Sequence, residues 1–206
     1  MIIEKVVVGP FATNCYIVGD ESSKEGIIID PGDEAEKILE KVNELGLDIK
    51  LILLTHGHID HAGALKEVKE ALNVDVAIHI DDANFELYQS AGLVLGLFYP
   101  KPSAPDRLLK DGDTLDIAGM RFDVLHTPGH TAGGICLLRD GVVFSGDTLF
   151  NHSIGRSDLP GGNHSHLMES IHSKLLVLDD NTTVYPGHGD KTTIAAERNG
   201  NPFLSS

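Results

Sequence analysis

Short apolar runs recur along the chain and are separated by Gly, Asp, Asn or Pro. This pattern is typical of β-strands bounded by turns. None of the runs approaches the roughly 20 apolar residues that a membrane-spanning helix needs. The predicted strands are Ile2–Val8, Cys15–Val18, Gly26–Ile29, Leu51–Leu54, Val76–Ile80, Thr114–Ile117, Arg121–Leu125, Ile135–Arg139, Val142–Phe144 and Thr182–Tyr185.

Three segments instead repeat apolar residues at helical spacing. They are Asp33–Leu45, which Gly46 follows as a suitable C-cap, Ala62–Leu72 and Ser165–Leu178. Strands and helices are therefore interspersed, with many β segments and few crossovers. This order predicts an α+β fold in which two mostly antiparallel sheets pack together with helices outside.

The length of 206 residues suits one large domain, and no internal repeat or low-complexity segment divides it. We therefore predict a single domain over residues 1–206. The segment Asn84–Pro105 differs from the rest because it is apolar and carries several Gly and Pro residues. Two interpretations stay open for it: a partly helical loop that covers the core, or an apolar flap that lines the substrate entrance.

The net charge of −15 and the pI of about 5.0 limit the partners of the protein. So acidic a surface repels phosphate backbones and anionic membranes, which argues against nucleic acid and membrane partners. Residues Met1–Pro10 include Glu4 and Lys5 and lack the charge and length pattern of a signal peptide. We expect a cytoplasmic protein in which Cys15 and Cys136 are reduced core thiols.

Three histidines and one aspartate lie within six positions just after the apolar run Leu51–Leu54. These residues are His56, His58, Asp60 and His61. Packing alone does not explain them, because crowded and desolvated polar groups cost free energy unless they are paired. Imidazole and carboxylate ligands together suit zinc, iron or manganese, so the cluster indicates a metal site.

Three further predicted strands end in a potential metal ligand. The ligands are His130, Asp147 and His188, and each one directly follows a glycine. Glycine allows a sharp turn at a strand end, which would bring these side chains to one edge of the sandwich. Five histidines and two aspartates are about the number that two metals need when they share a carboxylate and a hydroxide. We therefore predict two divalent metal ions.

Four motifs in this order resemble the metallo-β-lactamase superfamily: His-x-His-x-Asp-His, Pro-Gly-His-Thr, Ser-Gly-Asp-Thr and Tyr-Pro-Gly-His. The resemblance covers nearly the whole chain and implies a four-layer αββα sandwich. Carried over residue by residue, it implies a first metal position at His56, His58 and His130, a second at Asp60, His61 and His188, and a bridging carboxylate at Asp147.

Within the superfamily, the chain is most similar to short, single-domain glyoxalase II-like hydrolases. The segments behind this resemblance are Asn14-Cys15-Tyr16, Ile29-Asp30-Pro31-Gly32, Gly155–Gly162 and Asn201-Pro202-Phe203. The resemblance implies hydrolysis of a thioester such as a hydroxyacyl-glutathione. Only 18 residues follow His188, so much of the helical C-terminal domain with which full-length glyoxalase II binds glutathione is absent. The thiol part of the substrate therefore stays open.

Four more residues are candidates for supporting the metal ligands or the substrate. Asp30 is either a plain turn residue or, as the resemblance implies, a partner of the metal loop. Arg156 and Asp158 form either an ordinary surface ion pair or the edge of the substrate pocket. Thr131 belongs to the Pro-Gly-His-Thr motif and could support either role.

The expected reaction is attack on the acyl carbon by a metal-bridging hydroxide, with Asp60 and Asp147 as catalytic carboxylates. We expect zinc, with iron and manganese as alternatives, and a small-molecule substrate; the oligomeric state stays open. A persulfide dioxygenase with one iron on His56, His130 and Asp147 is the nearest rival. Lactonase or phosphodiesterase chemistry comes next, and a non-enzymatic metal-binding protein is least favoured. True β-lactamase activity is disfavoured, because zinc β-lactamases often have Cys where Asp147 stands.

Overall fold

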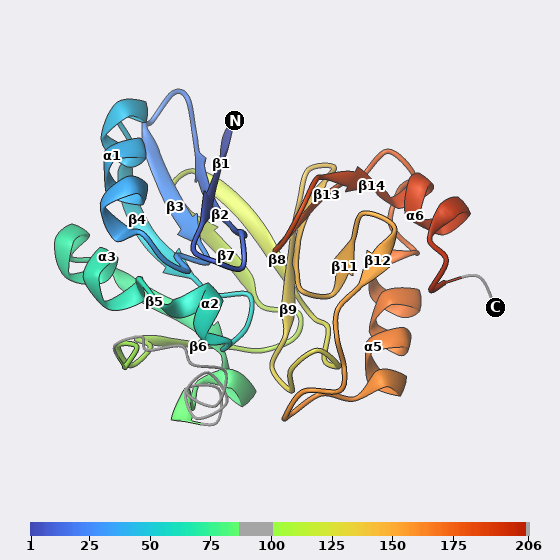
Figure 1. The fold of residues 1–206 in the computed structure, drawn as a ribbon. Helices are drawn as coiled ribbons and strands as arrows, with labels where there is room; N and C mark the ends of the chain where they lie inside the picture. Colours follow the sequence, from blue (N-terminus) through green and yellow to red (C-terminus); the bar gives the residue numbers. More distant parts are fainter. Residues whose placement is uncertain (87–100, 205–206) are drawn as a thin grey trace.

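Two six-stranded sheets lie face to face in the middle of the molecule, and helices cover both outer faces (Figure 1). The structure is a computed structural model that describes residues 1–86 and 101–204. The arrangement confirms the predicted α+β fold and its four αββα layers. Helices α1 (Ala35–Leu45) and α3 (Leu65–Leu72) cover the first sheet, and α5 (His164–Ser170) and α6 (Ile194–Gly200) cover the second.

The first sheet has the strand order β1-β2-β3-β4-β5-β6. Its first three strands are antiparallel, but β3 through β6 pair in parallel, contrary to the mostly antiparallel sheet expected from the sequence. For β3, β4 and β5 the reason is that α1 and α3 cross over between successive strands, and such a crossover returns the chain in the same direction. The strands are β1 (Ile2–Val8), β2 (Thr13–Gly19), β3 (Glu25–Ile29), β4 (Asp48–Leu53), β5 (Asp75–His79) and β6 (Arg107–Leu109).

The second sheet has the order β14-β13-β10-β9-β8-β7 and is antiparallel except between β10 and β13. These two strands pair in parallel because α5 connects the two halves of the sheet over its outer face. The strands are β7 (Thr114–Ile117), β8 (Met120–His126), β9 (Ile135–Arg139), β10 (Val142–Gly146), β13 (Thr183–Pro186) and β14 (Thr192–Thr193), with a separate hairpin of β11 (Leu149–Phe150) and β12 (Ser153–Ile154).

Three hydrophobic cores fill the spaces between the four layers. In β4, Leu51 and Leu53 belong to the core between the two sheets, whereas Ile52 and the following residue Leu54 belong to the core beneath α1 and α3. The third core lies between the second sheet and α5 and α6. Because both faces of the central strands are buried, these strands appear in the sequence as unbroken apolar runs rather than as alternating ones.

Several elements differ from the sequence predictions. The predicted helix Ser165–Leu178 is α5 followed by a π-helical turn, η2 (Ile171–Leu175). The short strands β6, β11, β12 and β14 and helix α6 were not predicted. Most of the segment Asn84–Pro105 lies outside the described residues, so both interpretations of it stay predictions, as does the single domain. In residues 1–86 and 101–204, no helix is both long enough and apolar enough to span a bilayer.

Candidate metal centre

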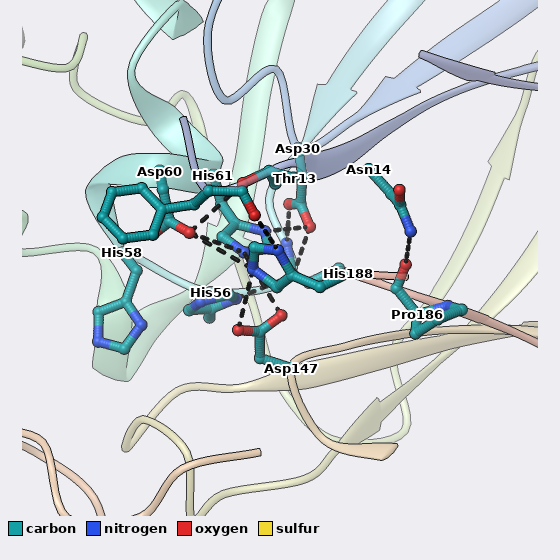
Figure 2. Close-up of polar contacts among 12 residues, drawn as sticks. Thr13, Asn14, Asp30, His56, His58, Asp60, His61, Asp147, Pro186 and His188 are labelled. Carbon is teal, nitrogen blue, oxygen red and sulfur yellow. Dashed lines mark hydrogen bonds and ion pairs between the residues drawn. The ribbon is translucent and has the colours of Figure 1, made fainter. Parts of the chain in front are cut away.

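The four strand-end motifs of the sequence meet at one end of the sandwich. The loop after β4 and the short helix α2 (Ile59–Ala62) come from the first sheet, and the ends of β8, β10 and β13 come from the second. Figure 2 shows side chains from both halves pointing toward one another. The structure thus brings together all seven predicted ligands: His56, His58, Asp60, His61, His130, Asp147 and His188.

One group of potential ligand atoms consists of His56, His58 and His130, whose atoms lie within 4.8 Å of one another. The Nδ1 atom of His58 lies 2.8 Å from Nε2 of His130. The ring of His56 is edge-on to both, with centroids 4.8 Å from His58 and 4.9 Å from His130. This is the set that the resemblance assigns to the first metal position.

A second group consists of Asp60, His61 and His188. The Nε2 atoms of the two histidines are 3.2 Å apart, and Oδ2 of Asp60 lies 3.6 Å from His61 Nε2 and 3.4 Å from His188 Nε2 (Figure 2). This is the set that the resemblance assigns to the second metal position.

Asp147 lies between the two groups. Its Oδ1 is 3.4 Å from Nε2 of His61, and its Oδ2 is 3.4 Å from Nε2 of His130 and 3.5 Å from Nε2 of His188. One carboxylate thus contacts histidines of both groups, which is the placement expected of a bridging ligand.

Four of the histidines have their other ring nitrogen held by a hydrogen bond. The Nδ1 atom of His61 contacts Asp30 at 2.9 Å, that of His130 contacts the Arg156 carbonyl oxygen at 2.7 Å, and that of His188 contacts the Phe11 carbonyl oxygen at 3.0 Å. His56 Nδ1 lies 3.0 Å from the Thr55 hydroxyl oxygen. Each bond leaves Nε2 directed at the centre and fixes the ring orientation, as in known metal sites.

Two histidines of the first group, His56 and His58, are held in the neutral form. Burial lowers the pKa of His58 to about 3, and the neighbouring His130 adds to the effect. Burial and the nearby His61 likewise hold the pKa of His56 well below its usual value. Neutral imidazoles have a lone pair available at neutral pH, which metal binding requires.

The second group behaves in the opposite way. Burial opposes the charged form of His61, but the carboxylates of Asp147, Asp60 and Asp30 outweigh it and raise the pKa of His61 to about 9. For His188, burial is outweighed by hydrogen bonds to Asp147 and Asp60, which raise its pKa to about 10. A divalent cation bound here would take the place of these protons.

The residues of the centre fit a metal on a further observation. Among the described residues, His56 Nε2 and Asp147 Oδ1 are buried side-chain atoms that accept no hydrogen bond. Buried polar atoms in native proteins nearly always have a partner, so each such atom needs an explanation. Both atoms are good ligands for a divalent cation, and both belong to the converging set. The centre has the donor chemistry of a divalent-metal site.

Asp30 lies where the resemblance implies a partner of the metal loop. It follows β3 with φ 53°, a left-handed backbone that is uncommon for a residue other than glycine. Its Oδ1 accepts the Thr55 backbone N–H at 2.7 Å, and its Oδ2 accepts the Thr55 hydroxyl at 2.6 Å and contacts His61 Nδ1. Asp30 is thus not a plain turn residue, because it holds the loop that carries His56.

The remaining predicted site residues lie at different depths. Thr131 is fully buried and its hydroxyl donates to Asp82 Oδ2 at 2.6 Å. Arg156 reaches the centre through its backbone carbonyl, whereas its guanidinium pairs with Asp158 at 2.9 Å and both side chains are largely exposed. The contacts between Arg156 and Asp158 are therefore those of a surface ion pair, next to the loop that holds His130.

Sequence reasoning missed two supports of the centre. Asn14, at the start of β2, donates from Nδ2 to the Pro186 carbonyl oxygen at 2.9 Å (Figure 2). The same nitrogen donates to the Gly189 carbonyl oxygen at 2.9 Å, and the two bonds hold the loop of His188. Asp82, at the end of the short helix η1 (Ile80–Asp82), contacts two other loops of the centre. A signal existed for Asp82, because it follows a buried strand closely, as Asp30 and Asp147 do.

A separate group, His79, Asp81 and His126, also brings potential ligands together. The rings of His79 and His126 are stacked, with centroids 4.0 Å apart and planes within 13° of parallel. Lone pairs in two nearly parallel ring planes do not converge on one point, so this geometry favours a structural stack. His126 also contacts the Ala132 carbonyl oxygen at 2.9 Å and supports the loop after His130.

Comparison with known proteins gives the family. The sequence pattern of the metallo-beta-lactamase superfamily matches residues 8–188. Hydroxyacylglutathione hydrolase GloC of Haemophilus influenzae is 40% identical over 211 residues, which cover 100% of this chain and 99% of GloC.

Two solved structures extend the match to the fold. The BLEG-1 B3 metallo-beta-lactamase is 37% identical with a TM-score of 0.94, and the match covers 100% of both chains. TTHA1623 in a di-iron-bound form is 42% identical with a TM-score of 0.90, and the match covers 98% of this chain and 100% of that one. The chain therefore belongs to the metallo-beta-lactamase superfamily.

Proposed function

We propose that the protein hydrolyses thioesters at a two-metal centre, with a hydroxyacyl-glutathione as the first substrate to test. The proposal rests on the position of Asp147, whose two carboxylate oxygens contact histidines of both ligand groups. A single metal would leave one of these groups without a role. The similarity to hydroxyacylglutathione hydrolase GloC supports the choice of substrate class.

Two divalent cations in such a centre would supply hydroxide from water at neutral pH and polarise the acyl carbonyl. The residues of the chain would hold the metal ions and orient the attacking water. Asp60 is 22% exposed at its side chain, compared with 10% for Asp147, so Asp60 is the more open carboxylate. We assign Asp60 to orient the attacking water and to accept its proton, and Asp147 to serve both ligand groups.

A thiolate is a good leaving group, so the reaction does not require a strong general acid. The chain's two cysteines do not offer an alternative nucleophile. Both are buried, and burial raises the pKa of the Cys136 thiol to about 11. Neither thiol is therefore suited to act as a nucleophile at neutral pH. We propose zinc as the metal, with iron or manganese as alternatives; the di-iron form of TTHA1623 makes iron the first alternative to test.

The test measures metal content and thioester hydrolysis on the same samples. Asp147→Ala and His58→Ala should each lose metal and lower kcat/KM for S-lactoylglutathione by at least about 100-fold, because even residues that only support ligands matter 10–100-fold. His172→Ala is the matched control, since His172 is an exposed histidine on η2. Full turnover by a metal-depleted Asp147→Ala protein would rule out the proposal.

Assays with other acyl and phosphoryl substrates test the alternative enzyme activities. A β-lactam belongs in the panel because of the similarity to BLEG-1, and a lactone and a phosphodiester test the remaining hydrolase chemistries. Oxygen uptake with glutathione persulfide tests a dioxygenase that would use His56, His130 and Asp147 with one iron. That interpretation gives no role to Asp60, His61 and His188, which is why we rank it second. Cytoplasmic location and a small-molecule partner stay part of the proposal.

A further inference from the structure

Asp82 is a buried carboxylate outside the seven-ligand set. Its side chain is fully shielded from solvent at the end of η1, which directly follows β5. Oδ2 accepts the Gly57 backbone N–H at 3.0 Å and the Thr131 hydroxyl at 2.6 Å, and Oδ1 accepts the Gly133 backbone N–H at 2.7 Å. Hydrogen bonds to a carboxylate in so dry a place are among the strong ones in proteins.

The donors of these bonds belong to the two segments that carry the first ligand group. Gly57 stands between His56 and His58, and Thr131 directly follows His130. One carboxylate therefore connects a loop of the first sheet to a loop of the second, beside the place where the three imidazoles converge.

The packing around Asp82 is close enough to fix its position. A Cβ atom on Gly133 would lie 2.5 Å from the Asp82 backbone nitrogen and 2.8 Å from both Cβ and Cγ of its side chain. Such distances leave no room for any side chain at position 133. The approach of the two segments is thus specified by a glycine on one side and a short carboxylate on the other.

The second ligand group has a different support. Asp30 contacts His61 at Nδ1, and the Phe11 carbonyl oxygen accepts from His188. Asp30 also accepts from Thr55, next to His56, so it serves both groups. The contacts that orient the rings of His61 and His188 are nevertheless made by Asp30 and Phe11, and they remain when Asp82 is replaced.

We propose that Asp82 is a positioning residue that sets the metal affinity of the first position, His56, His58 and His130, and leaves that of the second unchanged. Without Asp82 the two loops would have to become ordered when the metal binds, and that ordering lowers affinity. The inference rests on the two-group metal centre proposed above.

The test separates the two positions by disabling each in turn. Asp82→Asn keeps the size of the side chain but replaces one acceptor oxygen with an NH2 group that faces a donor. In the His188→Ala background, where the first position remains, Asp82→Asn should weaken zinc binding by about 10–100-fold in chelator competition. In the His58→Ala background, where the second position remains, the same change should leave zinc affinity within about twofold.

Two further variants control for a loss of stability. Glu197 is also a fully buried carboxylate with three donors, from the His152 backbone, Thr192 and Asn201. Glu197→Gln should lower the melting temperature without changing zinc affinity at either position. Thr131→Val removes a single donor to Asp82 and keeps the shape, so it stands in if Asp82→Asn does not fold. Thr131→Val should weaken zinc binding at the first position only, by about threefold to tenfold.

Equal losses at both positions would overturn the inference, because they would mean that Asp82 supports the fold and not one metal position. Unchanged affinity of the first position in Asp82→Asn or Thr131→Val would overturn it as well. Neither result bears on the proposed hydrolysis, which is judged by the thioester assay on the unaltered protein. If the unaltered protein binds no divalent metal, both proposals are wrong.

Discussion

At Gly187 the backbone after β13 passes close to two of the predicted metal ligands. A Cβ atom there would lie 2.2 Å from Oδ1 of Asp147 and 2.8 Å from Cε1 of His61. Gly187→Ala should therefore displace the Asp147 carboxylate and reduce both zinc content and thioester hydrolysis by at least about tenfold. Elemental analysis and the hydrolysis assay on one sample measure both effects.

The matched control for this prediction is Gly112→Ala. Gly112 has φ +80° and open space around its Cα. Alanine at that position adds backbone strain of about 1 kcal/mol but crowds nothing at the centre. If Gly112→Ala reduced zinc content as much as Gly187→Ala does, close approach to Asp147 would not be the cause.

The pKa values of the centre predict a stability maximum for the metal-free protein. The pKa values of His61 and His188 are raised to about 9 and 10, so protonation of these histidines stabilises the folded protein. This contribution to the free energy of unfolding is fully present below pH 6.5 and is lost as pH rises through 9–10. The lowered pKa of His58, about 3, has the opposite consequence, because the unfolded chain binds the proton more tightly between pH 3 and 6.5. Stability should therefore peak near pH 6.5 and fall on both sides.

Urea unfolding of the chelated protein at a series of pH values measures this profile. The zinc-loaded protein provides the comparison, since bound cations take the place of the protons on His61 and His188 and the alkaline decline should largely disappear. A metal-free protein whose free energy of unfolding stays level from pH 6.5 to 10 would contradict the assigned ion pairs.

At this scale, residues of strong chemical character could be predicted, and the resemblance also indicated the support by Asp30, but the supports by Asn14 and Asp82 could not be predicted. The seven ligands were evident because imidazoles and carboxylates cluster after apolar strands, where packing gives them no role. Asn14 and Asp82 act through hydrogen bonds to backbone atoms more than 20 residues away in sequence. No local pattern encodes such a partner, so these roles required the three-dimensional structure.

Among the elements, helix α6 depends on one buried carboxylate. Glu197 in α6 accepts the Thr192 hydroxyl at 2.6 Å, the Asn201 side-chain amide at 2.7 Å and the His152 backbone N–H at 3.0 Å. Glu197→Ala leaves these buried donors without a partner and should lower the free energy of unfolding by about 2–3 kcal/mol. Urea denaturation checks the loss.

Metal content should not change in Glu197→Ala, because α6 contributes none of the seven ligands. A protein that unfolds more easily yet holds the same zinc would show that α6 stabilises the second sheet without positioning the centre. Zinc loss in proportion to the loss of stability would contradict this separation.

Element types followed from the sequence where segments were long and patterned. The apolar spacing of α1 and α3 and the unbroken runs of the central strands predicted them well. Strand direction in the first sheet could not be predicted, because a doubly buried strand reads alike in parallel and antiparallel pairs. The two-residue strands β11, β12 and β14 are too short for any periodicity to appear, and their pairing is decided by tertiary contacts.

For the whole molecule, the metal centre joins the two halves of the sandwich. The first sheet carries the ligands from His56 to His61, and the second carries His130, Asp147 and His188. Free metal at about 1,000 times its Kd would stabilise the native state by about 4 kcal/mol. For a chain of this size that corresponds to a shift of about 8–16 °C in melting temperature.

Differential scanning calorimetry with and without EDTA measures that shift. Asp147→Ala provides the reference, since a protein that has lost the bridging carboxylate should show little response to the chelator. An unaltered protein with the same melting temperature in EDTA and in zinc would mean that no tightly held metal joins the two halves.

The distance between ligands along the chain has a consequence for the living cell. His61 and His188 touch in the folded protein but are 127 positions apart in sequence. At translation rates of about 5–20 residues per second, a ribosome needs about 6–25 s to pass from one to the other. During that interval the second ligand group lacks His188, so the nascent chain offers only part of the predicted ligand set. We therefore expect the finished fold to select among zinc, iron and manganese from the ions that surround it.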